Sequence, residues 1–174
     1  MNLDKAFETV FGFVASGGPV LIAIAFLTFI MWLLLFERFF FYKGTLRRLS
    51  KRTIKVWDKR PERKSWNAHQ IRIAMISRVR ERIMQNLNLI ATLVALCPLF
   101  GLLGTVTGMI DVFDVLATSG GADAKSMAAG VKKATIPTMA GMVAAISGVF
   151  GNTIVTQIAQ REAQLLEDHM TMDH

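Results

Sequence analysis

The chain has 174 residues, of which 52% are hydrophobic, and 20 Lys and Arg against 13 Asp and Glu give it a formal net charge of +7. Its charged residues leave three long uncharged stretches: 28 residues between Glu8 and Glu37, 28 between Arg82 and Asp111, and 27 between Lys133 and Arg161. Because about 20 apolar residues in a helix cross the hydrocarbon core of a bilayer, the sequence predicts three membrane spans and excludes a soluble globular protein.

The first predicted element is a short amphipathic helix within residues 1–18. Apolar side chains recur there at helical spacing from Leu3 to Val14, so we expect this helix to lie at the membrane surface, on the outer side of the membrane that the chain spans. The run Ser16-Gly17-Gly18 ends it, and Pro19 can occupy the first turn of the next helix. The first membrane span is then predicted over residues 19–42, and its last four residues are aromatic, as is typical of a headgroup-level anchor.

Residues 43–86 are predicted to form a basic loop and helix on the cytoplasmic side. Fifteen of the 20 Lys and Arg lie between Arg38 and Arg82, and positive charge close to membrane spans marks the cytoplasmic face. This orientation puts the N-terminus outside and the C-terminus inside the cell. The basic residues lack a recognised nucleic-acid-binding motif, so we expect contact with anionic lipid and no nucleic acid.

The second span is predicted over residues 87–117. Helical spacing of apolar residues begins near Ala68, and no Gly or Pro intervenes before the span. One long helix is therefore expected to project into the cytoplasm and enter the membrane, with a bend near Pro98. An outer loop over residues 118–133 follows. The third span with its tail covers residues 134–174, and its helix is also expected to continue into the cytoplasm. The predicted fold class is an all-α membrane protein with three transmembrane helices.

Small residues form a stripe on each of the last two spans. Gly101, Gly104 and Gly108 are three and four residues apart, and Gly141 and Gly148 are seven apart, so each set lies on one face of its helix. Glycines allow two membrane helices to approach closely, and this is how membrane helices gain packing energy without a hydrophobic driving force. The stripes therefore indicate helix packing, either between these two spans alone or also around a further helix.

Hydroxyl and amide groups form a second stripe. Thr138, Asn152 and Thr156 fall within about 60° of one another on the third span, with Thr135 at one edge. Thr105 stands at mid-depth of the second span. Each threonine could simply bond a carbonyl one turn back in its own helix. As an aligned set, these groups instead favour a polar lumen or interface, because polar groups within a bilayer need partners or water.

Two segments carry a resemblance to a known family. The run Gly101-Leu-Leu-Gly-Thr-Val-Thr-Gly-Met-Ile110, with Phe113 after it, resembles the signature of the ExbB/TolQ/MotA proton-channel family. Ala134 together with Thr138-Met-Ala-Gly-Met-Val-Ala-Ala-Ile146 resembles its second signature, on the following helix. The likeness extends over about residues 16–160 and is greatest to a short ExbB-type biopolymer transport protein.

The resemblance implies a ring of this subunit, typically a pentamer, in the bacterial inner membrane. Its second and third helices would line a lumen that holds one or two single-span partners of the ExbD type. A carboxylate on the partner would carry protons, and the matching positions Thr105 and Thr138 would form its polar surroundings. The proton motive force would then energise a TonB-type protein and, through it, outer-membrane transport.

Two positions depart from the family pattern: Ser147 stands where a proline often ends the second signature, and Lys133 stands at a position that bears on the chemistry. ExbB and TolQ proteins commonly carry a glutamate five residues before the second-signature threonine, where this chain has Lys133. Lys133 either interacts with the partner's carboxylate at the outer mouth or, beside Lys132, only marks topology and contacts headgroups. The glutamate's role is not carried over to it.

Other chemistry finds no support in the sequence. His69, His169 and His174 are isolated and lack metal-ligand spacing, and no nucleophile–base arrangement or phosphate loop is assignable. We expect no enzyme activity, no metal and no cofactor. Two alternatives to the ExbB-type motor stay open: a TolQ-like motor for envelope maintenance, and a non-conducting scaffold for a single-span partner.

Overall fold

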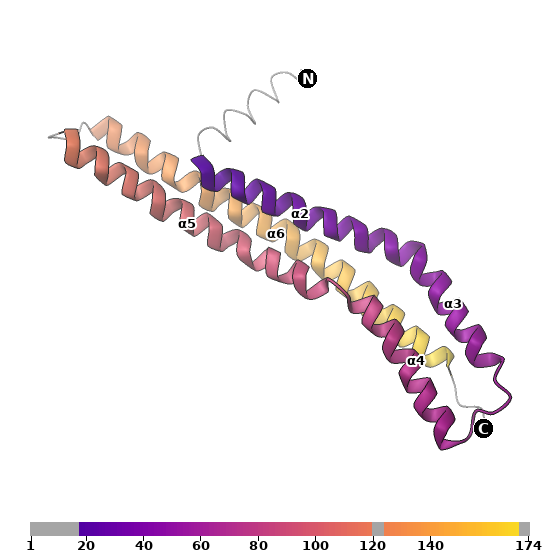
Figure 1. The fold of residues 1–174 in the computed structure, drawn as a ribbon. Coiled ribbons are helices and arrows are strands. Elements are labelled where there is room, and N and C mark those ends of the chain that lie inside the picture. Colours follow the sequence, from indigo (N-terminus) through magenta and orange to yellow (C-terminus); the bar gives the residue numbers. More distant parts are fainter. Residues whose placement is uncertain (1–17, 120–123, 171–174) are drawn as a thin grey trace, which may run out of the picture. The chain divides into compact units, whose positions relative to one another are not determined.

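The computed structural model describes residues 18–119 and 124–170, and all five regular elements in these ranges are α-helices (Figure 1). They are α2 (Gly18–Lys43), α3 (Thr45–Asp58), α4 (Trp66–Met84), α5 (Leu87–Ser119) and α6 (Ala124–His169). Three segments are long and apolar enough to cross a membrane: Gly18–Lys43, Trp66–Thr118 and Met127–His169. The predicted all-α fold with three membrane-length segments is confirmed. The interfacial helix expected within residues 1–18 falls almost entirely outside the described residues.

The helices form two compact units. The first comprises residues up to Trp32 together with Ala91–Val149, and the second comprises Leu33–Ile90 with Phe150–His174. In the first unit, α2, α5 and α6 meet around a small cluster of Ile24, Cys97 and Ala144. Each helix contributes one of these residues, which shows that the three apolar segments pack as neighbours in this unit.

The second unit is closed by larger side chains. Trp57 and Leu46 of α3 and Ile83 of α4 are fully buried, and α3 and α4 are in direct contact. Ser65 caps the N-terminus of α4, where its hydroxyl accepts a hydrogen bond from the Ala68 amide at 3.2 Å. Apolar residues of α3 recur at helical spacing, and this periodicity explains why a segment expected to be only a connection folds as a helix.

The expected uninterrupted helix into the second span is wrong. Helix α4 ends at Met84 and α5 begins at Leu87, with Gln85 extended (ψ 139°) and Asn86 left-handed (φ 65°). Asparagine adopts this conformation more readily than most residues with a side chain. The interruption therefore requires neither Gly nor Pro, and the absence of both from this segment did not indicate it.

Two side chains of α2 contact the end of α4. The Tyr42 hydroxyl donates a buried hydrogen bond to the carbonyl of Ile83 at 2.8 Å, and the Arg38 guanidinium donates to the carbonyl of Arg82 at 3.3 Å. Arg38 is only 3% exposed, and Glu37 lies 3.4 Å from its second terminal nitrogen. Because the last carbonyls of a helix have no partner within it, these bonds satisfy groups that the interruption leaves open.

Helix α6 begins ten residues earlier than the third span was expected to begin. It starts at Ala124 and continues for 46 residues to His169, about 69 Å at the usual helical rise. Lys125, Lys132 and Lys133 made residues 118–133 look like a loop, but charge limits only what enters the bilayer, while a helix continues through water. At the other end, Arg72 of α4 donates to the carbonyls of Glu167 and Met170.

Candidate functional site

The candidate site is the contact between α5 and α6 within the first unit. Gly101 lies against Thr138: a Cβ added to Gly101 would stand 3.0 Å from the Thr138 Cα and 3.1 Å from the Pro137 carbonyl oxygen. A Cβ on Gly141 would stand 2.5 Å from the carbonyl oxygen of Cys97. These are distances between backbones, which only residues without side chains permit.

The glycine stripes continue along the same contact. Gly104 faces the ring of Pro137, and a Cβ on Gly108 would stand 2.7 Å from the Cβ of Ala134. Gly148 instead faces Met31 of α2 and Val94 of α5. The residues expected to pack helices thus lie at the contacts between α5 and α6, and Gly148 also brings α2 into the packing. Pro137 did not figure in the sequence prediction of the packing surface.

Thr138 differs from Thr105 and Thr135 in its hydrogen bond. Its hydroxyl donates to the carbonyl of Gly101 on the opposite helix at 2.8 Å. Thr105 donates to the carbonyl of Leu102 at 2.7 Å, and Thr135 to that of Lys132 at 2.9 Å, each within its own helix. The Thr138 hydroxyl therefore joins α5 to α6, while Thr105 and Thr135 make local bonds.

Burial separates these groups further. Thr105 and Thr138 are half-buried, whereas Thr135 and Lys133 are exposed. Asn152 lies in the second unit, where its side-chain oxygen is buried and has no hydrogen-bond partner among the described residues. The structure thus brings Thr138 to the α5 glycine stripe, with Thr105 one helical turn after Gly101, and it leaves Thr135 and Lys133 on the exposed surface of α6.

The chemistry available at this site is that of hydroxyl groups. A hydroxyl that donates its proton to a carbonyl keeps its lone pairs as acceptors, so Thr105 and Thr138 can each accept a hydrogen bond from an approaching proton donor. The residues between Arg82 and Asp111 and between Lys133 and Arg161 include no carboxylate and no histidine. Within the described residues, no three His, Cys, Asp or Glu side chains are grouped as metal ligands.

Comparison with known proteins agrees with the sequence motifs. Residues 36–168 match the family model described as the MotA/TolQ/ExbB proton channel family. An ExbB-like biopolymer transport protein of Synechocystis sp. is 47% identical over 68 residues, which are 37% of this chain and 27% of that protein.

Two further relatives extend the match. The biopolymer transport protein ExbB1 of Vibrio cholerae is 35% identical over 89 residues, or 51% of this chain and 39% of that protein. The Tol-Pal system protein TolQ of Pseudomonas aeruginosa is 39% identical over 82 residues, or 47% of this chain and 35% of that protein. The matched segments thus span well under half the length of each of these relatives.

Proposed function

Because the chain belongs to the MotA/TolQ/ExbB proton channel family, we propose that it is a ring-forming stator subunit of an inner-membrane motor driven by the proton motive force. Family membership and three membrane-length segments make it a multi-pass protein of the inner membrane and part of a proton-channel complex. We further propose that the subunits form a ring, typically a pentamer, and that this ring energises a TonB-type protein.

The observation that carries the proposal is the Thr138 hydroxyl, bonded across to Gly101 in a span without titratable carboxylates. An ionised carboxylate at the centre of a bilayer is costly. Hydroxyl acceptors stabilise its protonated form, and they do not trap the ionised form in a salt bridge. The carboxylate of an ExbD-type single-span partner can then take up and release protons beside Thr105 and Thr138.

The exposed surfaces of the same helices support assembly. Large apolar side chains are exposed on α5 at Leu102 and Val106 and on α6 at Met142 and Ile146. Within a bilayer these surfaces contact lipid or other helices. In a ring of copies around a partner, the neighbouring subunits and the partner supply those other helices. Lys133, exposed near the start of α6, is available to the partner's polar segment.

The test is the substitution Thr138→Val, which keeps the shape of the side chain and removes its hydroxyl. In cells that carry the ExbD-type partner, this variant is expected to lose energised uptake of iron chelates while still assembling. Thr107→Val is the matched control, because Thr107 is exposed and donates only within α5, to Leu103 and Gly104. Equal uptake by the Thr138 variant and the unmodified chain would disprove the proton-path role.

The similarity to a TolQ protein supports a second candidate, a motor for envelope maintenance. Complementation distinguishes the two: an ExbB-type subunit restores iron-chelate uptake, whereas a TolQ-like subunit restores resistance to detergent. Lys133 in place of the family glutamate motivates a third candidate, a scaffold that does not conduct. A proton flux that requires Thr138 in reconstituted vesicles would exclude the scaffold.

A further inference from the structure

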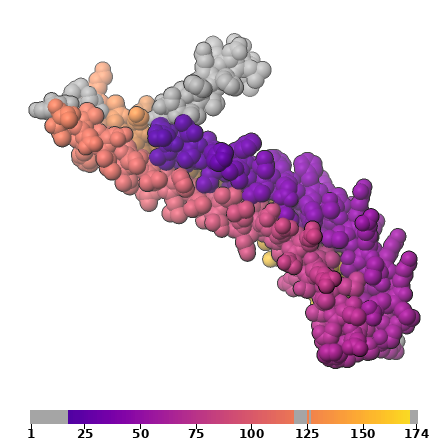
Figure 2. Space-filling model, in the orientation of Figure 1, coloured from indigo at the N-terminus to yellow at the C-terminus, as the bar shows by residue number. Residues whose placement is uncertain are grey.

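The outward face of the second unit changes character where α2 gives way to α3. Leu33, Phe36 and Phe40 are exposed at helical spacing on α2, and Phe40 is 69% exposed. Helix α3 begins at Thr45, and its exposed residues include the cations Arg47, Arg48, Lys51, Arg52 and Lys55. Figure 2 shows the surface of this part of the chain uncovered on the face in view. An apolar surface is thus followed within about two turns by a cationic one.

A pocket lies at the start of this cationic surface. It is lined by five residues, Gly44, Thr45, Arg48, Leu49 and Arg52, which we call the α3 pocket. Arg48 and Arg52 are four residues apart, so their side chains project from the same face of the helix. No acidic residue lines the pocket, and neither guanidinium has an ion-pair or hydrogen-bond partner in the described part of the chain.

The buried residues of α3 determine which side of the helix carries this pocket. Leu46 and Trp57 are fully buried, and Thr53 is buried with its hydroxyl bonded to the Leu49 carbonyl at 3.0 Å. These residues hold one side of the helix against the unit. Arg48 and Arg52 fall on the opposite side of the helix and are exposed, so the positive charge of the pocket is accessible to a ligand from outside.

The position of the pocket along the chain limits what that ligand is. Counting about 20 residues from Gly18 brings the end of the hydrocarbon core close to Glu37. The aromatic residues Phe39–Tyr42 come next, at the level where such rings meet headgroups. The α3 pocket follows within about two helical turns. Arginine side chains are long enough to reach back toward the interface, where phosphate is the abundant anion.

We propose that the α3 pocket binds the phosphate group of an anionic membrane lipid. Two guanidinium groups on one helix face provide several parallel N–H donors for phosphate oxygens, and the Thr45 hydroxyl can donate another hydrogen bond. The surrounding Arg47, Lys51 and Lys55 raise the local concentration of anionic lipid, as basic segments beside a membrane do. This inference depends neither on the proposed motor function nor on which face of the membrane the segment occupies.

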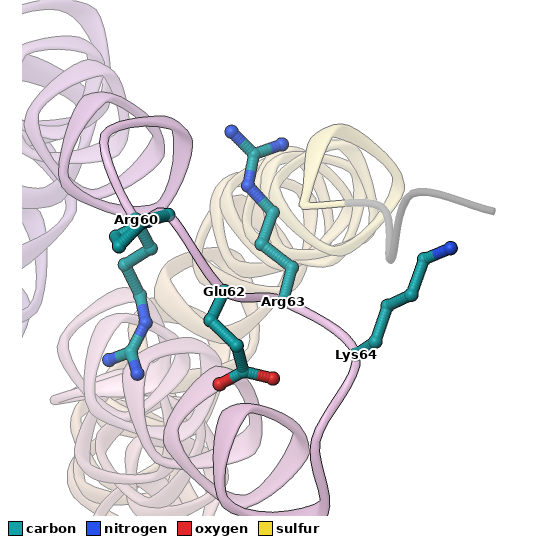
Figure 3. A pocket seen from close by; sticks show the side chains of 5 residues that line it. Arg60, Glu62, Arg63 and Lys64 are labelled. Carbon is teal, nitrogen blue, oxygen red and sulfur yellow. The ribbon is translucent and has the colours of Figure 1, made fainter.

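A second basic pocket offers a contrast and a control (Figure 3). It lies in the turn between α3 and α4 and is lined by Arg60, Pro61, Glu62, Arg63 and Lys64. Its lining contains a carboxylate, and the Arg63 guanidinium already donates to the Asp58 carbonyl at 2.5 Å. The whole of α3 separates this pocket from the end of α2, so it lies farther along the chain from the aromatic residues at the membrane interface. It carries a similar charge, but its carboxylate and this distance make it less suited to binding lipid phosphate.

The test compares Arg48→Gln/Arg52→Gln with Arg60→Gln/Lys64→Gln, two variants of the full chain that lose the same charge. Each protein is purified in detergent, and the retention of added phosphatidylglycerol and phosphatidylcholine is measured by native mass spectrometry. The unmodified chain is expected to retain phosphatidylglycerol preferentially. The first variant should lose that preference by about fivefold to thirtyfold, and the second should keep it.

Three controls make the result decisive. Arg48→Lys/Arg52→Lys keeps the charge and should keep part of the preference, and circular dichroism should report unchanged helix content in every variant. An equal loss in both charge-matched variants would mean that net charge alone attracts lipid and would overturn the proposal. Displacement of phosphatidylglycerol by millimolar inorganic phosphate or glycerol phosphate would assign the pocket to a soluble phosphate and would also overturn it.

Discussion

Each of the two units of this chain is stabilised internally by a different kind of contact. In the first, α5 and α6 approach backbone to backbone through Gly101 and Gly141, and the Thr138 hydroxyl donates a hydrogen bond across to the Gly101 carbonyl. In the second, Trp57 fills the interior and Tyr42 reaches across to a backbone carbonyl. Within a bilayer, water exclusion drives no packing, so close contact has to replace it. The first unit should therefore tolerate added volume least, and the second should depend most on particular side chains.

The largest expected effect is that of Gly141→Ala in the first unit. The new Cβ would stand 2.5 Å from the Cys97 carbonyl oxygen, a backbone atom that cannot move without shifting α5. We expect a loss of about 1–3 kcal/mol, as for other overpacked sites, measured as reduced resistance to unfolding in detergent. Gly44→Ala is the control, since its Cβ would meet only the Phe40 carbonyl at 3.6 Å. Equal stability of the two variants would show that the close contact is not essential.

Tyr42→Phe tests the second unit by removing one oxygen atom. The ring keeps its packing, but the carbonyl of Ile83 loses its buried partner at the end of α4. A cost of about 1–2 kcal/mol is expected, because a buried acceptor left without a partner is unfavourable. Hydrogen exchange of the α4 amides should report the change locally. Unaltered exchange would mean that water or another donor replaces the hydroxyl.

The interruption between α4 and α5 predicts a contrast between two substitutions at one position. Asn86→Gly should be nearly neutral, because glycine adopts φ 65° without strain. Asn86→Val should cost about 1–2 kcal/mol, since a β-branched residue is disfavoured there. Thermal unfolding of both variants measures the difference. If valine were tolerated as well as glycine, the left-handed conformation would not be a requirement of the fold.

The smallest expected effect concerns acid pH and the start of α4. The Glu62 carboxylate accepts hydrogen bonds from the hydroxyl and amide of Ser65, and these bonds lower the pKa of Glu62. A lowered folded-state pKa means that the stabilisation is present above the unfolded pKa of this group and is lost as the pH falls through the folded one. Helix content from circular dichroism should fall slightly below about pH 4.5, and Glu62→Gln should remove this dependence.

Much of the fold followed from where charge is absent. The uncharged stretches located all three membrane-length segments, because burying an ionised side chain in hydrocarbon is costly whatever the tertiary structure. The ends of helices were harder to predict. Lys125 and Lys132 marked the edge of the membrane, but α6 continues through both. The helical spacing of Leu46, Thr53 and Trp57 could have indicated α3 before the structure did.

The candidate site was also predictable from the sequence only in part. The spacing of Gly101, Gly104 and Gly108 placed them on one face of a helix, and the motifs around Thr105 and Thr138 identified the family. Spacing could not say that Thr138 bonds across to Gly101 while Thr135 bonds within α6. Both are threonines on the same helix, and only the neighbouring helix distinguishes them.

The sequence by itself determined that this chain has three segments long and apolar enough to cross a membrane, which faces of its helices carry small residues, and which family it belongs to. These properties depend on the cost of charge in hydrocarbon and on helical periodicity, and both act locally along the chain. Only the tertiary structure decided the break at Asn86, the bonds from Arg38 and Tyr42 to the end of α4, and the partner of the Thr138 hydroxyl. The hydrogen bonds join groups that lie 37 to 44 residues apart in sequence, and only packing brings such groups together.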